Sequence, residues 1–163
     1  MLIQQNTNGS NFFNRSWEDF KVGFVDTSGN YWLGNEWLSQ LTLTGRYKLR
    51  FDLQSRSNTS NWYYAEYSTF RVWSEEKNYA LQVTGYSGNA SNAFGWHNSG
   101  MQFTTYDRDN DLHSTGNCAV LKGAGFWYWS CGGCRVNGGS YFYWADLPGG
   151  RDLQSSRMWL QCK

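Results

Sequence analysis

The chain has 163 residues, a length that suits one domain with its own hydrophobic core. Its 14 basic and 13 acidic residues are scattered and give a formal net charge of +1. Nucleic-acid binding needs clustered Lys and Arg side chains that neutralise phosphates, so this class of partner is excluded. No stretch approaches the roughly 20 apolar residues that cross a bilayer, so we expect no membrane insertion.

Aromatic residues and glycines stand out in the composition, with 10 Trp, 11 Tyr, 10 Phe and 18 Gly against one proline. Aromatic side chains are enriched in β-strands, and glycine is common in the turns between them. The composition therefore predicts short aromatic strands joined by many turns, with helix as a minor element.

The first predicted helix begins at Ser16 and ends at Gly23. A serine can cap the free backbone N–H groups of a helix start, and a glycine can end a helix in the left-handed conformation. Trp17, Phe20 and Phe24 are spaced by three and four residues, so they share one face. We expect that face to pack into the core.

A second, shorter helix is predicted over residues 35–40. Asn35 would cap its start, because an asparagine side chain accepts hydrogen bonds from the first free N–H groups. Trp37, Leu38 and Leu41 would form its apolar side and face the core.

Strands follow in the middle of the chain. Apolar residues at 47, 49, 51 and 53 alternate with polar ones, which predicts a strand over 46–53 with one face on the core. Strands at 63–73 and 79–84, joined by a turn at 74–78, predict an antiparallel hairpin. After Tyr86 the pattern gives way to Gly, Asn, Ser and aromatics, a long irregular region of the kind that is functional or needs a staple.

All four cysteines lie in the last third of the chain, at Cys118, Cys131, Cys134 and Cys162. They permit three disulfide connectivities or a metal site. A zinc site at the C-x-x-C of residues 131–134 would lack a second pair of Cys or His ligands.

Four sequons for N-glycosylation favour a secreted glycoprotein. Their asparagines are Asn8, Asn14, Asn58 and Asn89. Each of them must lie on the surface if it carries a glycan.

Three carboxylates occupy alternate positions at Asp107, Asp109 and Asp111. Calcium takes six to eight oxygen ligands, and this spacing lets side chains point to one centre while later carbonyls turn in behind them. An EF-hand is excluded, because Cys118 stands where its Glu at position 12 is required and no amphipathic helices flank the loop. The alternative to a metal site is an acidic turn in solvent.

The acidic loop resembles the D-x-D-N-D…G-N-C-A calcium signature of the fibrinogen C-terminal domain family, which includes fibrinogen chains, ficolins, tachylectins and angiopoietins. The resemblance extends across nearly the whole chain. It is carried by NFFNRSW (11–17), YWLGNE (31–36), YAEYSTFRV (64–72), GYSG (85–88), HNSGMQF (97–103) and NCA (117–119). The small N-terminal subdomain that the family usually carries before the position of Met1, with its own disulfide, has no counterpart in these matches.

The resemblance implies an α+β fold in which a central twisted antiparallel sheet with short helices precedes a long irregular subdomain held by calcium and disulfides. We expect one domain over residues 1–163. Its sheet-containing part would reach to about residue 100, and a part that binds calcium and ligand would span about 101–163.

The resemblance also implies a set of Ca²⁺ ligands. Asp109 and Asp111 would ligate through their side chains, carbonyl oxygens near His113 and Thr115 would complete the site, and Asp107 would support it. The imidazole of His113 need not ligate, because it suits a hard cation poorly. Calcium would hold the irregular region in shape.

Family members show a disulfide between cysteines separated as Cys118 and Cys131 are here, which leaves Cys134 and Cys162 as an expected second pair. In lectin-like members, acetylated ligands sit beside the second cysteine of the first pair, after a cis peptide bond. The corresponding bond here is Ser130–Cys131.

The implied ligand pocket consists of Ser130, backbone N–H groups of Cys131 and Gly132, and a lining of Lys122, Trp144 and Ala145. Gly132 replaces a histidine of the family, and Lys122 replaces a tyrosine of the lectin pocket. Acetyl specificity is therefore in question. The neighbouring aromatic run at 126–128 is interpreted as core packing.

We expect no enzyme, because neither His97 nor His113 has a recognisable nucleophile and orienting acid around it. The leading hypothesis is an extracellular, calcium-dependent recognition domain of the lectin kind that binds glycans or acetylated groups in innate immunity. The alternative is a protein-interaction domain of the angiopoietin or fibrinogen kind that binds a receptor. Oligomers would form through segments outside this chain.

Overall fold

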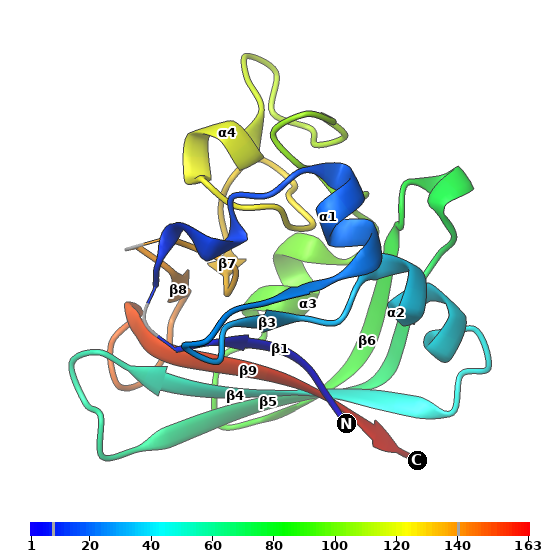
Figure 1. Cartoon of the computed structure of the whole chain (residues 1–163). Helices are drawn as coiled ribbons and strands as arrows, with labels where there is room; N and C mark the ends of the chain where they lie inside the picture. The colour runs from blue at the N-terminus through cyan, green and yellow to red at the C-terminus, as the bar shows by residue number, and fades with distance from the viewer. Residues whose placement is uncertain (8, 140) are drawn as a thin grey trace.

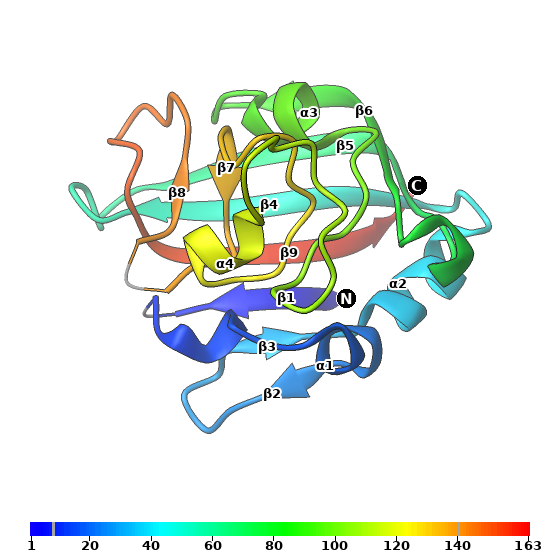
Figure 2. The same cartoon turned by 90° about the horizontal axis from the view of Figure 1, so that it is seen from above.

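The computed structural model describes all residues except 8 and 140. Its centre is a seven-stranded sheet in the order β2-β3-β1-β9-β4-β5-β6, in which every neighbouring pair is antiparallel. The helices and the long irregular segments cover one face of this sheet (Figures 1 and 2). The expected α+β fold is thereby confirmed.

The strands of the main sheet are β1 (Leu2–Asn6), β2 (Phe24–Val25), β3 (Tyr31–Trp32), β4 (Tyr47–Ser55), β5 (Trp62–Val72), β6 (Leu81–Gly88) and β9 (Leu153–Cys162). A separate two-stranded sheet pairs β7 (Cys134–Arg135) with β8 (Tyr143–Trp144). The helices are α1 (Trp17–Val22), α2 (Asn35–Thr42), α3 (Ala93–Asn98) and α4 (Cys118–Lys122), with single 3-10 turns η1 (Asn11–Phe13) and η2 (Glu75–Lys77).

Helix α1 exists as predicted, but it ends at Val22, and Phe24 lies in β2 rather than on the helix face. Ser16 caps it in a reciprocal capping box, since its hydroxyl accepts a bond from the Asp19 N–H while the Asp19 carboxylate accepts one from the Ser16 N–H. Trp17 and Phe20 are buried. Gly23 follows the helix at φ +95° with an extended ψ, and an added Cβ there would lie 2.3 Å from the Leu33 carbonyl oxygen.

Helix α2 exists as predicted, but its start and its apolar face differ. Gly34, with φ +115°, occupies the capping position, and Asn35 is the buried first residue of the helix. The Asn35 side chain accepts a hydrogen bond from the indole of Trp32 at 3.1 Å, so it anchors the core. Leu38 is buried as expected, whereas Trp37 is 56% exposed.

The predicted strand β4 and the β5–β6 hairpin are confirmed. The expectation that everything after Tyr86 is irregular is wrong, because β9 lies in the middle of the sheet between β1 and β4. Within β9, Met158 pairs with Phe51 of β4 on one side and Gln4 of β1 on the other. The chain thus leaves the sheet after β6 and returns to its centre with β9. The last residues of the predicted part 101–163 therefore belong to the sheet, and a role in calcium or ligand binding stays a prediction for the residues between β6 and β9.

The core lies between the sheet and the irregular layer, and the run Phe126–Tyr128 is fully buried in it, as predicted. The Trp127 indole donates to the Tyr79 carbonyl oxygen at 2.7 Å. The Trp127 carbonyl accepts from the buried amide of Asn98 at 2.6 Å. These bonds fix the irregular segment to the sheet layer.

Of the sequon asparagines, Asn14 and Asn89 are exposed and Asn58 is half-buried, while Asn8 lies outside the described residues. Among the described residues, no helix combines the length and the apolar character needed to span a membrane.

Candidate functional site

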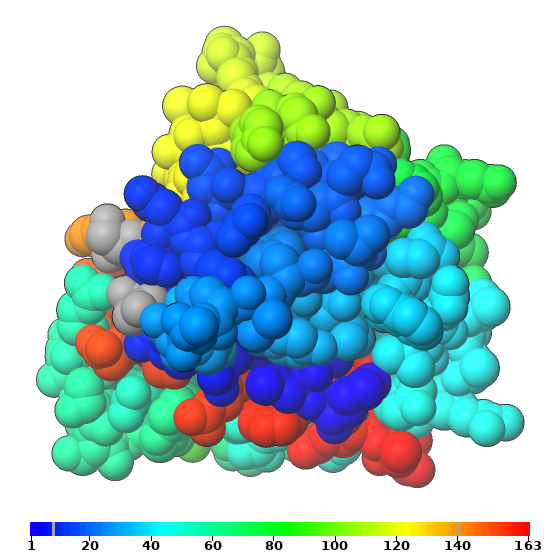
Figure 3. Space-filling model, in the orientation of Figure 1, coloured from blue at the N-terminus to red at the C-terminus, as the bar shows by residue number. Residues whose placement is uncertain are grey.

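The candidate site lies at the end of the molecule farthest from the sheet (Figures 1 and 3). It consists of residues 105–121, which include the acidic loop and most of α4, and residues 129–133. We call this surface the distal face. It has little regular structure, so disulfide and hydrogen bonds must hold its shape.

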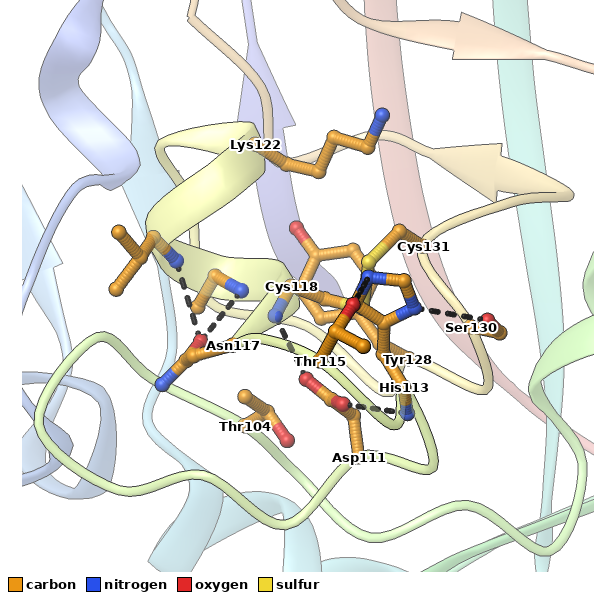
Figure 4. Close-up of a disulfide and its surroundings, with 12 residues drawn as sticks. Thr104, Asp111, His113, Thr115, Asn117, Cys118, Lys122, Tyr128, Ser130 and Cys131 are labelled. Atoms are coloured by element: carbon orange, nitrogen blue, oxygen red, sulfur yellow. Dashed lines mark hydrogen bonds between the residues drawn. A yellow bond between two sulfur atoms is a disulfide. The ribbon is translucent and has the colours of Figure 1, made fainter.

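A disulfide joins Cys118 to Cys131, with 5.1 Å between their Cα atoms, as expected (Figure 4). It links the first residue of α4 to the segment 129–133. A backbone hydrogen bond of 2.8 Å from the Leu112 N–H to the Trp129 carbonyl joins the acidic loop to the same segment. One covalent bond and one hydrogen bond therefore hold the two segments of the distal face together.

The second expected disulfide is wrong, because Cys134 and Cys162 are both free thiols. Cys134 is buried in β7 and its thiol donates to the Asn98 side-chain oxygen at 3.3 Å. Cys162 is exposed at the end of β9, opposite Tyr47 of β4. Cys162 lies at the end of β9, next to the C-terminus of the chain, and this end of β9 is well away from β7 (Figures 1 and 2).

The two thiols should differ in reactivity. Burial raises the pKa of the Cys134 thiol well above its usual value and shields it from reagents, so only Cys162 should react in the native protein. A titration with a thiol-specific disulfide reagent, without reductant, should count about one thiol per chain in the folded state and about two in denaturant. A count near zero in denaturant would instead support the second disulfide.

Asp111 is the last of the three carboxylates of the acidic loop. One of its oxygens accepts the Cys118 N–H at 2.7 Å, and the other accepts the His113 N–H at 2.8 Å (Figure 4). Burial is the main reason that its pKa is raised, and the negative charge of Asp109 adds to this, while the two N–H donors act in the opposite direction. The Asp111 N–H also donates to the Asp109 carboxylate at 3.4 Å, so the two residues lie side by side, and their role as calcium ligands stays a prediction.

Asp107 has a different place. Its carboxylate accepts the Thr105 hydroxyl at 2.7 Å and the backbone N–H of Trp17, the first residue of α1, at 2.9 Å. The adjacent Arg108 guanidinium lies 4.1 Å from the centre of the Trp17 ring. The observed partners of Asp107 thus attach the acidic loop to α1, a role that sequence reasoning missed.

His113 and Thr115 lie beside the disulfide. The imidazole of His113 is 3.2 Å from the Ser130 hydroxyl through Nδ1 and 3.5 Å from the Thr115 hydroxyl through Nε2 (Figure 4). The described residues contain no cluster of three or more His, Cys, Asp or Glu side chains arranged for a metal ion. Two mutually repelling carboxylates followed by backbone carbonyls are nevertheless a donor set that fits a hard cation.

The expected acetyl pocket is corrected in two respects. The Ser130–Cys131 peptide bond is trans, since no described residue has a cis bond, although Cys131 adopts an unusual φ of +62°. Trp144 does not line a pocket, because its side chain is fully buried, with its ring centre 4.9 Å from that of Phe51. Its indole donates to the Ser91 carbonyl at 3.0 Å.

The other expected pocket residues remain near the surface. Gly132 is exposed and has open space on its side-chain side, whereas Lys122 and Ala145 are half-buried. The Ala145 N–H donates to the Gly133 carbonyl at 3.1 Å, which places β8 next to the segment that follows the disulfide. Ligand binding by these residues stays a prediction.

Large apolar side chains project from the distal face, a feature that sequence reasoning missed. Leu112 is 63% exposed, Leu121 61% and Trp129 50%, and Val120 and Tyr106 are exposed as well. The sequence did contain a signal for the helix that exposes two of these side chains, because the N-C-A motif at residues 117–119 marks the start of α4. The side chain of Asn117 caps that helix by accepting from the N–H groups of residues 119 and 120. One face of α4 is then buried, and Val120 and Leu121 point outward.

Comparisons with known proteins agree with this architecture. The family model for the C-terminal globular domain of fibrinogen beta and gamma chains matches residues 1–161. Angiopoietin-related protein 2 of Mus musculus is 41% identical over 161 residues, covering 91% of this chain and 32% of its own length. Fibrinogen-like protein A of Apostichopus parvimensis is 37% identical, covering 93% of this chain and 56% of its own length.

Solved structures show the same similarity. The fibrinogen-like globe domain of human ANGPTL2 superposes with a TM-score of 0.89 at 37% identity, over 99% of this chain and 79% of that one. A lamprey fibrin D-dimer, complexed with the peptide ligand Gly-His-Arg-Pro-amide, gives a TM-score of 0.86 at 30% identity, over 98% of this chain and 60% of that one. The chain spans about a third of the length of angiopoietin-related protein 2. By sequence and by structure, the chain belongs to the family of fibrinogen C-terminal globular domains.

Proposed function

We propose that this chain is a non-enzymatic, protein-binding domain that recognises its partner through the distal face. The observation that carries the proposal is the group of exposed apolar side chains on a surface held by a disulfide and by hydrogen bonds. Exposed apolar groups that a fold holds in place are typical of protein-interaction sites. Trp129 is the expected anchor, because buried tryptophans contribute much of the binding free energy at interfaces.

The relatives support protein binding more than glycan binding. They are angiopoietin-related proteins and fibrinogen chains, and the similar lamprey fibrin structure is complexed with a peptide. The trans bond before Cys131 and the burial of Trp144 also differ from the acetyl pocket that the lectin hypothesis requires. An extracellular location accords with the Cys118–Cys131 disulfide, since disulfides persist in oxidising compartments.

The test is a screen of the folded chain against purified receptor ectodomains, with a glycan array in parallel and with calcium present. We expect binding to a protein, and we expect Trp129→Ala to weaken that binding by about 30-fold, because truncating an interface anchor costs about 2 kcal/mol. Trp37→Ala is the matched control, since this exposed tryptophan lies on α2, outside the distal face. Binding should survive it.

Two results would contradict the proposal. One is retention on the glycan array alone, competed by free N-acetylglucosamine. The other is an equal loss of protein binding in the Trp129 and Trp37 variants, since a surface outside the distal face would then make the contact.

Calcium is the proposed cofactor of the distal face, bound by the carboxylates of Asp109 and Asp111 with carbonyls near His113 and Thr115. Because a ligand of the folded state stabilises it by mass action, calcium at ten times its Kd should add about 1.4 kcal/mol to the free energy of unfolding. Asp109→Asn should remove this increment, and Asp52→Asn on β4 should keep it. An identical melting temperature in calcium and in excess EDTA would contradict the proposal.

A further inference from the structure

A groove of about 390 Å³ lies between α2 and the end of the β5–β6 hairpin. Its lining includes Leu43 just after α2, Val72 at the end of β5, and Trp73 and Lys77 in the connection to β6. Figures 1 and 2 show α2 and this connection at the same end of the sheet, away from α4. The residues that line the groove are therefore distinct from those of the distal face, although Glu75 beside the groove lies 3.8 Å from the Arg108 guanidinium of that face.

Two cations share one aromatic ring in this groove. The guanidinium carbon of Arg71 is 3.7 Å from the centre of the Trp73 ring, and the Lys77 ammonium is 4.2 Å from it. Neither forms a salt bridge with any residue that the structure describes. Stacking on the ring uses the flat face of the guanidinium and leaves its in-plane N–H groups free for an acceptor. The two positive charges therefore remain uncompensated.

Arg71 also carries a buried donor without an acceptor. Its Nε is inaccessible to solvent and has no hydrogen-bond partner among the described residues. A buried N–H in this state costs free energy that no described residue offsets. A ligand in the groove would therefore be bound by the terminal N–H groups of the guanidinium and by its positive charge. A carboxylate is the natural acceptor, because its two oxygens match the planar fork of an arginine.

Glu36, the acidic residue in the groove lining, already forms hydrogen bonds with other residues. The Glu36 carboxylate accepts the Tyr79 hydroxyl at 2.9 Å and the Gln40 amide at 3.0 Å. Nearby Glu75 pairs with Lys21 at 2.6 Å. Neither acid reaches Arg71 or Lys77 as a salt-bridge partner, so the groove retains a positive end.

The rest of the lining is largely apolar. Leu43 is 64% exposed and the half-buried Trp73 ring contributes further apolar surface, whereas Val72 is buried behind them. An apolar surface next to two cations matches a ligand that combines an apolar side chain with a carboxylate. A sulfated glycan would supply the anion, but its hydroxyl-rich ring offers little to the exposed Leu43 side chain.

We propose that this groove binds an acidic peptide segment of a partner protein. A glutamate or aspartate carboxylate pairs with Arg71 and Lys77, and a neighbouring apolar side chain packs on Leu43 and Trp73. This site is independent of the distal face and gives the domain a second contact surface.

The test is a titration of the labelled chain followed by two-dimensional NMR. The probe is the peptide Leu-Glu-Leu-Glu-Leu, capped at both ends, and its matched control has Gln in place of each Glu. We expect the acidic peptide to shift the indole signal of Trp73 and to bind at least about tenfold more tightly than the control peptide. Arg71→Gln and Lys77→Gln should each weaken binding by about tenfold, whereas Arg56→Gln at an exposed site should leave it unchanged.

Several outcomes would overturn the proposal. Equal affinity for the two peptides would remove the role of the carboxylate. Unchanged affinity in the Arg71 variant, with its spectrum showing a folded chain, would remove the site. A sulfated disaccharide that displaces the peptide and binds more tightly at the same signals would overturn the assignment to a peptide.

Discussion

Replacing both Cys118 and Cys131 with alanine is expected to lower the free energy of unfolding by about 3 kcal/mol. The disulfide closes a loop with a sequence separation of 13, and removing it returns about that much conformational entropy to the unfolded chain. For a chain of this length the melting temperature should fall by roughly 6–12 °C. Urea and thermal unfolding followed by circular dichroism measure both quantities.

Cys162→Ala provides the control for this experiment, because it removes an exposed, unpaired thiol. Its melting temperature should match that of the unchanged protein. The double variant should also lose partner binding, since the bond holds α4 against residues 129–133. A double variant as stable as the Cys162 variant would show that the hydrogen bonds and the core, and not the disulfide, hold the distal face.

Gly133→Ala is expected to be about as damaging, at about 3 kcal/mol. Gly133 has φ +90°, and an added Cβ would lie 2.3 Å from the Cβ of His97 on α3. The backbone conformation costs a non-glycine residue about 1–2 kcal/mol, and overpacking adds about 1–3 kcal/mol. The contact also sets how the segment after the disulfide rests on α3, so urea unfolding and partner binding should both be measured.

The adjacent residue is the matched control. Gly132 has no atom within 4 Å of an added Cβ and no positive φ, so Gly132→Ala should change the unfolding free energy by less than about 0.5 kcal/mol. If the two alanine variants were equally stable, the close packing of Gly133 on His97 would be refuted.

Local signals in the sequence were sufficient for α1, β4 and the β5–β6 hairpin. The Ser16 cap and the spacing of Trp17 and Phe20 specify α1 within a few residues, and strict alternation specifies β4. The Cys118–Cys131 pair was likewise expected from family resemblance. These features could be predicted because each depends on residues that are close in the sequence or on a family motif that this chain contains.

Candidate site residues were predictable to different degrees. Asp109 and Asp111 are neighbours in the structure because they are two residues apart on one turn, which the alternation of acids already indicated. Asp107 shares that spacing, yet its carboxylate is drawn to Trp17, a residue 90 positions away along the chain. Only the packing of α1 against the acidic loop decides between these two uses of an aspartate.

By itself, the sequence determined the class of fold, its local elements and the place of the acidic loop. Tertiary structure alone decided that β9 enters the centre of the sheet, that Trp144 is a core residue and that Cys134 and Cys162 are free thiols on strands of two different sheets. The physical reason is that β9 carries few local strand signals and is stabilised by pairing with β1 and β4 on both sides. That pairing brings together residues 98 or more positions apart, and no local sequence pattern indicates it.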